Sequence, residues 1–281
     1  MRQQAASQPP GRALCRPLRM RVAGRVDGAG PVELSGLVLS RRQSQVLWTH
    51  NDSGDIARVF AIATNGGLLG TVAVAGADNV DWEDIAIGPS AGSGDALYIA
   101  DIGDNLAMRP GVAVYRVPEP RLADGVPPAT KPAQRLDLRY PDGPHDAEAL
   151  LVDPATGALV IVTKAFGGTA GVYAADAPST RAPTVMRRAG TVSLGVGEPV
   201  TGGDVSADGG TIALRSYGHV FVWSHRRGES LVAALGRPPC TAQADLLAEG
   251  QGEALALTRD GRALYTVAEG SRPALRRYAA D

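Results

Sequence analysis

The feature that most constrains the fold of this chain is an internal repeat that occurs five times. Each repeat starts with small or acidic residues, continues as a short apolar strand, and meets a turn rich in Gly, Asp, Pro or Ser. A second and a third strand-like run follow each time. Repeats of about 50 to 65 residues with several strands each are typical of the blades of a β-propeller. The five openings are ELSGLVLS (33–40), DWEDIAIG (81–88), DAEALLVD (146–153), TGGDVSAD (201–208) and QGEALALT (251–258).

The strand count predicts how the ring of repeats closes. Four repeats have room for a fourth strand, whereas the fifth ends after its third, and the strand-like segment 18–26 has no repeat of its own. A sheet without its outer strand leaves an unpaired edge, which proteins usually cover. We therefore predict that residues 17–281 form one all-β domain, a five-bladed propeller of four-stranded blades closed by the N-terminal strand. The alternatives are a six-bladed propeller, with a blade hidden in 105–145, and a pair of β-sandwiches.

Charge and composition exclude some classes of partner. The chain has 28 Lys and Arg residues against 29 Asp and Glu residues, so its net charge gives no bulk attraction to nucleic acid or anionic membranes. No apolar run reaches the 18 residues of a membrane-spanning helix. We expect no nucleic-acid binding, no membrane insertion and a monomeric protein.

The N-terminal residues and the two cysteines leave alternatives open. Residues 1–16 are polar and lack the apolar region of a signal peptide, so they are expected to form a disordered leader. On that basis either the protein stays inside the cell or the export signal is missing from this chain. Cys15 and Cys240 are either two unrelated thiols or one disulfide that ties down the N-terminal strand.

An acidic residue recurs at one position of the repeat. Alignment of the third residue of each opening gives Ser35, Glu83, Glu148, Gly203 and Glu253. The first strand of a blade lines the central channel, so three glutamates should meet there, and protons or a cation must offset their repulsion. Oxygen-only ligands favour Ca²⁺. The predicted ligands are Ser35, Glu83, Glu148 and Glu253; the alternative is a wide, wet channel whose glutamates bind nothing in particular.

A second group of polar residues is expected at the same face, where the second strand of each blade ends. Mixed acids and bases there can hold a metal together with an anionic group such as phosphate. Asp52 and Asp101 are the candidate catalytic residues, although ordinary turn chemistry is an equally good explanation for such segments. No G-x-S-x-G, P-loop or dinucleotide-binding motif is present. The candidate substrate-binding residues are His50, Asn51, Lys164, Arg215 and Arg272.

The ordered set Ser35, Glu83, Glu148, a small residue and Glu253 resembles the calcium-activated apyrases. More distantly, the repeats are similar to the esterase-like phytase and strictosidine-synthase-like propellers of bacteria. The apyrase resemblance implies a five-bladed propeller with Ca²⁺ in the tunnel, hydrolysis of nucleoside di- and triphosphates, and an extracellular location. It gives Asp52 a water-positioning role and places Asp101 at the analogous point of the second repeat. Gly203 and Asn51 depart from the family pattern.

Two readings of the function remain open from the sequence. The first is a Ca²⁺-dependent hydrolase that acts on a small phosphate-bearing molecule at the channel mouth. The second is a non-catalytic propeller with a structural calcium and a face that binds a ligand or a protein. A third, glycoside hydrolysis by a carboxylate pair among Asp52, Asp101 and Glu148, would need a sugar platform, and the few aromatic residues argue against one.

Overall fold

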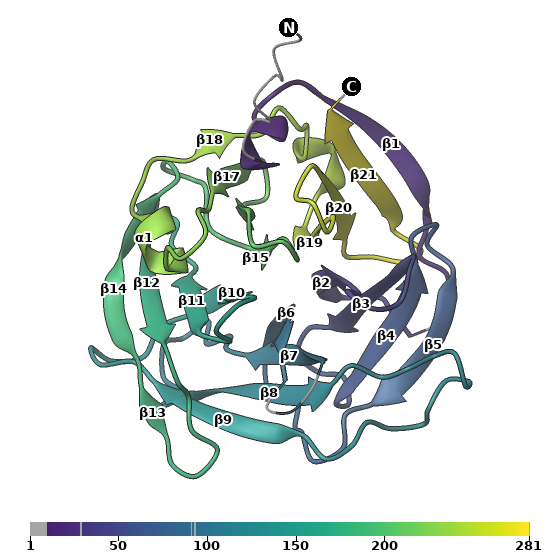
Figure 1. Cartoon of the computed structure of the whole chain (residues 1–281), viewed down its shortest axis with the longest axis horizontal. Helices are drawn as coiled ribbons and strands as arrows, with labels where there is room; N and C mark the ends of the chain where they lie inside the picture. Colours follow the sequence, from purple (N-terminus) through teal and green to yellow (C-terminus); the bar gives the residue numbers. More distant parts are fainter. Residues whose placement is uncertain (1–9, 29, 91, 93, 281) are drawn as a thin grey trace, which may run out of the picture.

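The computed structural model describes residues 10–28, 30–90, 92 and 94–280, and it is a five-bladed β-propeller (Figure 1). Each blade is an antiparallel sheet whose first strand lies at the central channel. The blades contain β2 (Leu34–Leu39), β3 (Val46–Asn51), β4 (Arg58–Ala63) and β5 (Leu68–Ala73); β6 (Trp82–Pro89), β7 (Asp95–Asp101), β8 (Val112–Pro118) and β9 (Gln134–Arg139); β10 (Ala147–Val152), β11 (Leu159–Thr163), β12 (Thr169–Ala175) and β14 (Arg187–Ser193); β15 (Gly202–Val205), β16 (Thr211–Arg215), β17 (Val220–Ser224) and β18 (Cys240–Thr241); and β19 (Gly252–Leu257), β20 (Ala263–Ala268), β21 (Ala274–Ala280) and β1 (Leu18–Arg25).

The predicted closure of the ring is confirmed. Strand β1 pairs antiparallel with β21, from Leu18 opposite Ala280 to Arg25 opposite Ala274, and completes blade five (Figure 1). The alternatives of six blades and of a sandwich pair are wrong. Segment 105–145 contains β8 and β9, which belong to blade two, rather than a blade of its own.

Three small elements add to this plan. The short β13 (Thr184–Val185) pairs parallel to β9, so blade two has a fifth strand. Blade four carries the helix α1 (Leu231–Leu235) before its two-residue outer strand, and a 3-10 turn, η2 (Leu247–Glu249), precedes blade five. Among the residues described, none of the helices has the length and apolar character required to cross a bilayer.

The core consists of five apolar clusters, and each joins two neighbouring blades. Trp48 of blade one, for example, packs with Trp82 and Tyr115 of blade two, and equivalent clusters fill the other four interfaces. Both faces of every blade are therefore buried. That explains why the inner strands are continuous apolar runs rather than alternating ones.

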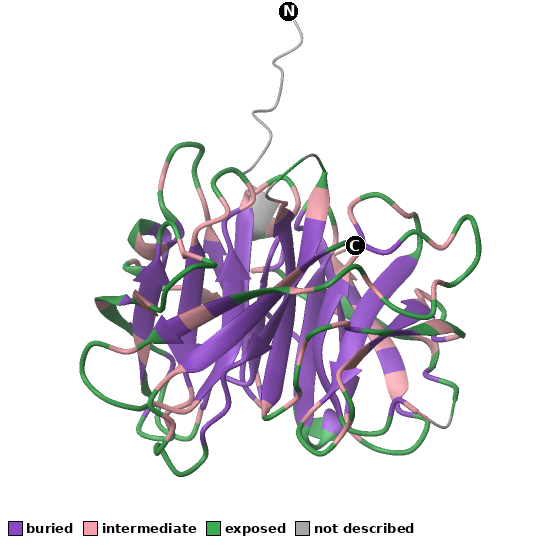
Figure 2. Cartoon of the chain, turned by 90° about the horizontal axis from the view of Figure 1, so that it is seen from below, coloured by how far each residue is buried: buried purple, intermediate pink, exposed green. Residues whose placement is uncertain are grey.

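The loops divide between two faces of the ring, with the buried strands running between them (Figure 2). We call one the mouth face; it consists of the loops that enter the first strand of a blade or join its second and third strands. The opposite face consists of the remaining turns, apart from 119–133, which packs along β5 through a bridge between Ala73 and Ala129. The mouth-face loops are 26–33, 52–57, 74–81, 102–111, 140–146, 164–168, 194–201, 216–219, 242–251 and 269–273, and the opposite-face turns are 40–45, 64–67, 90–94, 153–158, 176–183, 206–210, 225–239 and 258–262.

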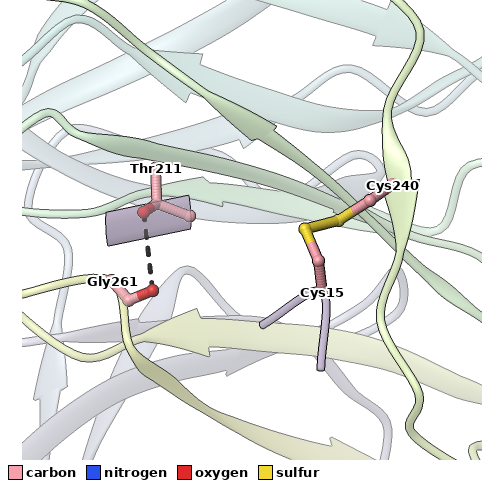
Figure 3. The surroundings of a disulfide bond; sticks show 4 residues. All are labelled: Cys15, Thr211, Cys240 and Gly261. Carbon is pink, nitrogen blue, oxygen red and sulfur yellow. Dashed lines mark hydrogen bonds between the residues drawn. A yellow bond between two sulfur atoms is a disulfide. The ribbon is translucent and has the colours of Figure 1, made fainter. Parts of the chain in front are cut away.

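The N-terminal segment is fastened to the ring. The first nine residues of the expected leader lie outside the described residues, but η1 (Pro10–Ala13) is followed by Leu14, which is fully buried between blades four and five. Cys15 forms a disulfide with Cys240, close to the contact in which the hydroxyl of Thr211 donates to the carbonyl of Gly261 (Figure 3). The folded domain therefore begins before residue 17. A disulfide of this kind is typical of proteins that fold in an oxidising compartment, which hints at an extracellular or periplasmic location.

Candidate metal centre at the channel mouth

The three channel glutamates are each presented by a β-bulge. In β6, β10 and β19 the register with the second strand skips one residue, and the skipped residues are Glu83, Glu148 and Glu253. A bulge leaves a residue outside the ladder and redirects its side chain. The bulges therefore free these carboxylates from the alternation of the strand and allow all three to meet at the channel mouth.

The geometry of the three glutamates suits a cation. Glu83, Glu148 and Glu253 each offer a carboxylate oxygen, these oxygens lie within 4.8 Å of one another, and all three side chains are buried. Two oxygens bound to one Ca²⁺ at 2.3–2.6 Å lie at most about 5 Å apart. Oε1 of Glu148 accepts a hydrogen bond from Nζ of Lys164, whereas its buried Oε2 has no partner among the described residues. An unpartnered buried carboxylate oxygen in such a cluster is a free ligand atom.

Without a cation, the carboxylates of this cluster repel one another. Burial, followed by the negative charge of Glu253, raises the pKa of Glu148 to about 7, even though Lys164 opposes the shift. Burial and the charge of Glu148 raise the pKa of Glu83 well above its usual range. Like charges in a site screened from water favour either protonation or a bound cation.

Further carboxylates extend the cluster toward solvent. Asp52 and Glu269 form a second group with Glu253, and Asp52 forms a third with Asp81 and Glu83, each with oxygens within 4.8 Å. Burial raises the pKa of Asp52 to about 6 and that of Glu269 to about 7. Glu269 directly follows β20, the second strand of blade five, and nothing in its own repeat marks it as a partner of Glu253.

The structure places the predicted ligand Ser35 next to the bulge of blade one. In this blade the register skip falls on Gly36, with φ of 66°, whereas in β6, β10 and β19 it falls on the glutamate. The pairs Leu34–Asn51 and Leu37–Thr49 match Trp82–Asp101 and Ile85–Ile99 of blade two, so Ser35 keeps the place of Glu83 along the strand. The hydroxyl of Ser35 donates to the backbone carbonyl of Glu83 at 2.5 Å. Blade four has no bulge, because Gly203 pairs directly with Leu214. Ser35 as a Ca²⁺ ligand therefore stays a prediction.

Two aspartates that follow in the inner strands link neighbouring blades. Oδ2 of Asp84 accepts hydrogen bonds from the backbone amides of Leu150, at 2.8 Å, and Gly203, at 3.3 Å, so this carboxylate links blades two, three and four. Oδ2 of Asp204 accepts from the amide of Leu257 in blade five at 2.8 Å. These carboxylates therefore hold neighbouring blades together.

Asp101, a predicted catalytic residue, makes structural contacts next to the carboxylate cluster. It is fully buried, pairs with Nη2 of Arg109 at 2.8 Å, and accepts the amide of Asp81 at 3.2 Å. Nη1 of Arg109 also donates to the carbonyl of Gly103 at 2.6 Å. Asp101 therefore positions loop 102–111, and its burial against Arg109 argues against a catalytic role. Neither Arg109 nor Gly103 was predicted from the sequence, although Gly103, the glycine of ADIGDN, marks a close approach of the backbone.

The position of Gly103 supplies a test of this geometry. A Cβ atom on Gly103 would lie 2.2 Å from Oε1 of Glu83 and 2.5 Å from the carboxylate of Asp81. We expect Gly103→Ala to push these carboxylates apart and to weaken Ca²⁺ binding by at least tenfold, while most of the fold stays intact. Calorimetric titration with Ca²⁺ checks this, with Gly167→Ala as a control, since no atom lies within 4 Å of a Cβ there and its φ is an ordinary one. Equal Ca²⁺ affinity for wild type and Gly103→Ala would show that Glu83 is not a Ca²⁺ ligand.

Three of the five predicted substrate-binding residues are committed to the protein itself. The amide of Asn51 makes four hydrogen bonds, to Gly30, Val32, Glu33 and Asp55, which use its full capacity. Arg215 is fully buried, where it donates to the carbonyl of Ala254 and pairs with Glu249 at 3.5 Å. Arg272 is an exposed residue that pairs with Asp27 at 2.8 Å. Each was chosen for its place at a strand end, but local partners already satisfy it.

The other two candidates, Lys164 and His50, lie closer to the site. Lys164 pairs with Glu148 and lies 5.9 Å from the ring centroid of Tyr217, whose hydroxyl donates to Glu253 at 3.3 Å. His50 is fully buried edge-on to Trp82, and burial lowers its pKa to about 4. His50 is therefore a neutral ring in the core, and Lys164 is the one predicted cation that the structure brings to the glutamates.

A large cavity lies elsewhere. It has a volume of about 870 Å³ and is formed on the opposite face between blades three and four, by turns that include Asp153, Asp208 and Glu229. The carboxylates of all three accept hydrogen bonds within these turns or from Arg237. The cavity is therefore separate from the channel glutamates.

The fold and the site together define a five-bladed propeller with a buried tricarboxylate at its channel mouth. No protein family matches this sequence, and no curated protein is similar to it. Among solved structures, the PQQ-bound form of aldose sugar dehydrogenase from Streptomyces coelicolor is similar, with a TM-score of 0.53 and 11% identity over 93% of this chain and 98% of that chain. This likeness supports the propeller fold alone. The resemblance to the calcium-activated apyrases stays a hypothesis.

Proposed function

We propose that this protein binds Ca²⁺ at the channel mouth and presents it to a ligand at the mouth face. The observation that carries this proposal is the buried set of Glu83, Glu148 and Glu253, with an unpartnered oxygen on Glu148. Three carboxylates with no histidine or cysteine among them favour a hard cation. Ca²⁺ takes six to eight oxygen ligands, whereas Mg²⁺ takes six. Oxygens of Asp52, Asp81 or Glu269 would supply the Ca²⁺ ligands beyond the three glutamates.

The quinone cofactor of the similar dehydrogenase is not extended to this chain. The channel mouth offers carboxylates, and Lys164 is already paired with Glu148. This donor set fits a divalent cation, and the described residues give no separate support for PQQ.

A second candidate function is the Ca²⁺-dependent hydrolysis of a small phosphate-bearing molecule. It is favoured by Asp52, which is half-buried next to Asp81 and Glu83 and has a pKa raised by burial to about 6. A carboxylate with a pKa near the working pH can act as a general base for a water molecule. Asn51, Arg215 and Arg272 add nothing to this candidate, because they are occupied elsewhere. We propose an extracellular location for either function.

The proposal is tested by calorimetric titration of EDTA-treated protein with Ca²⁺ and, separately, with Mg²⁺. We expect one site of micromolar or tighter affinity for Ca²⁺ and at least tenfold weaker binding of Mg²⁺. Incubation of the Ca²⁺-loaded protein with nucleoside triphosphates and p-nitrophenyl phosphate then tests the hydrolase candidate, with Asp52→Asn as the inactive variant. If metal-free protein, verified by elemental analysis, binds no Ca²⁺, the proposal is wrong.

The raised pKa values predict how pH acts on stability. Burial raises the pKa of Glu148 and Asp204 to about 7, so the folded state keeps protons that unfolded carboxyl groups release near pH 4. The metal-free protein should therefore lose stability as pH rises from about 4 to about 8. Ca²⁺ should reverse this trend, because the metal binds the ionised carboxylates. Urea unfolding at four pH values, in EDTA and in Ca²⁺, measures both slopes; a metal-free protein that gains stability across this range would contradict the prediction.

A further inference from the structure

The mouth face differs from the opposite face in its exposed apolar side chains. Fourteen large apolar residues are exposed among those described, and eight of them lie on the mouth-face loops. They come from seven of the ten mouth-face loops, since 140–146, 216–219 and 269–273 carry none. The most exposed are Leu106 (80%), Met108 (74%), Val196 (88%) and Leu247 (75%). No exposed large apolar residue lies on the described parts of the opposite-face turns. Apolar side chains gathered on one face of a protein mark a site of interaction.

The two faces also differ in charge. The mouth-face loops contain thirteen Asp and Glu residues against three Lys and Arg residues, whereas the opposite-face turns contain five acidic and eight basic residues. The three channel glutamates add to the acidic side. Four strand arginines, Arg58, Arg188, Arg215 and Arg276, pair with mouth-face acids and reduce this excess, but acidic residues still outnumber basic ones there. The near-neutral net charge of the chain therefore conceals a molecule that is polarised along the axis of the propeller. Such a field attracts cationic partners to one face.

We propose that the mouth face docks a basic amphipathic segment of a partner protein. Lys and Arg of the segment would face the acidic loops, and its apolar side would contact the exposed residues, which include the aromatic Phe166 (64%) and the flexible Met108. Aromatic and Met side chains are enriched at protein interfaces, and an amphipathic segment presents charge and apolar surface together. This proposal does not rest on bound Ca²⁺, because one divalent ion leaves the mouth-face loops acidic.

The charge pattern argues for a protein segment over a membrane. Biological membrane surfaces carry anionic lipids and attract basic patches. The mouth face has the opposite sign, so its approach to such a surface would be opposed. The negative charge of the mouth face favours association with a basic polypeptide, and the rate of association should fall as the salt concentration rises.

The test uses fluorescence anisotropy with a labelled 18-residue amphipathic helix of Lys and Leu. We expect a micromolar Kd at 50 mM NaCl, weakened at least fivefold at 300 mM NaCl. The double variant Leu106→Ser/Met108→Ser and the single variant Phe166→Ser should each weaken binding about tenfold. Val22→Ser, an exposed position (55%) on the outer strand β1, is the matched control and should bind as wild type does.

Two further probes complete the test. A helix of Glu and Leu with the same length should not bind, and neither should vesicles of phosphatidylcholine with one-quarter phosphatidylserine. Equal binding of the Glu/Leu helix, or unchanged binding by both loop variants, would overturn the proposal. Flotation of the protein with the vesicles in the absence of peptide binding would also overturn it and assign the apolar loops to a membrane. Measurement in EDTA and in Ca²⁺ separates this result from the fate of the metal site.

Discussion

Replacement of Glu253 by Gln is expected to remove the stabilisation of this protein by Ca²⁺. Glu253 belongs to two of the three carboxylate groups that could hold a cation, and its charge raises the pKa of both Glu148 and Glu269. A ligand at one hundred times its Kd stabilises the folded state by about 2.7 kcal/mol. For a chain of this size that corresponds to a rise in Tm of about 5–10 °C. The variant should show no rise.

The same variant should behave in the opposite way without metal. In EDTA, Glu253→Gln should unfold at or above the Tm of the wild type, because one buried negative charge has been removed from a repulsive cluster. Thermal melting with EDTA, Ca²⁺ and Mg²⁺ measures both effects. Glu198→Gln is the control, since Glu198 is a mouth-face carboxylate bound by Ser216 and His219 outside the cluster. A Ca²⁺ response in Glu253→Gln equal to that of the wild type would exclude Glu253 as a ligand.

Reduction of the disulfide between Cys15 and Cys240 is expected to be the second large effect. The two residues are separated by 225 positions, so the bond closes a very long loop and restricts the unfolded chain strongly. Loss of a native disulfide costs about 2–5 kcal/mol. We expect Cys15→Ser to lower the Tm by about 5–15 °C.

Reduction of the wild-type protein tests whether the lower Tm of Cys15→Ser comes from loss of the disulfide or from disturbed packing. Dithiothreitol should lower the Tm of the wild type to that of Cys15→Ser and leave the variant unchanged. The side chain of Leu14 stays available in the variant, so its buried contacts between blades four and five are retained. An equal Tm for reduced and oxidised wild-type protein would show that the bond contributes nothing to stability.

The repeat pattern was sufficient to predict the fold because each blade is a local hairpin-rich unit. The five openings became β2, β6, β10, β15 and β19, and the unassigned segment 18–26 became the missing strand of blade five. The apolar runs are continuous because neighbouring blades cover both faces of each sheet. The pairing of Cys15 with Cys240 could not be decided, since two cysteines carry no information about distance in space.

The site was predicted less well because its geometry depends on single-residue irregularities. Glu83, Glu148 and Glu253 were found since they recur at one repeat position. The bulges in β2, β6, β10 and β19 leave no trace in the apolar pattern. Residues at strand ends were all assumed to face the mouth, yet Arg215 is fully buried against Glu249.

The pairing of β1 with β21 has a consequence for the order in which the chain acquires its structure. Leu18 lies opposite Ala280, so blade five cannot be completed until residues 274–280 have left the ribosome. At a synthesis rate of about 5–20 residues per second, the first strand waits on the order of tens of seconds for its partner. During that interval blades one to four can form by local pairing, whereas both edges of the open ring are exposed to other chains. We therefore expect the open ring to be more prone to aggregation during synthesis than the finished one.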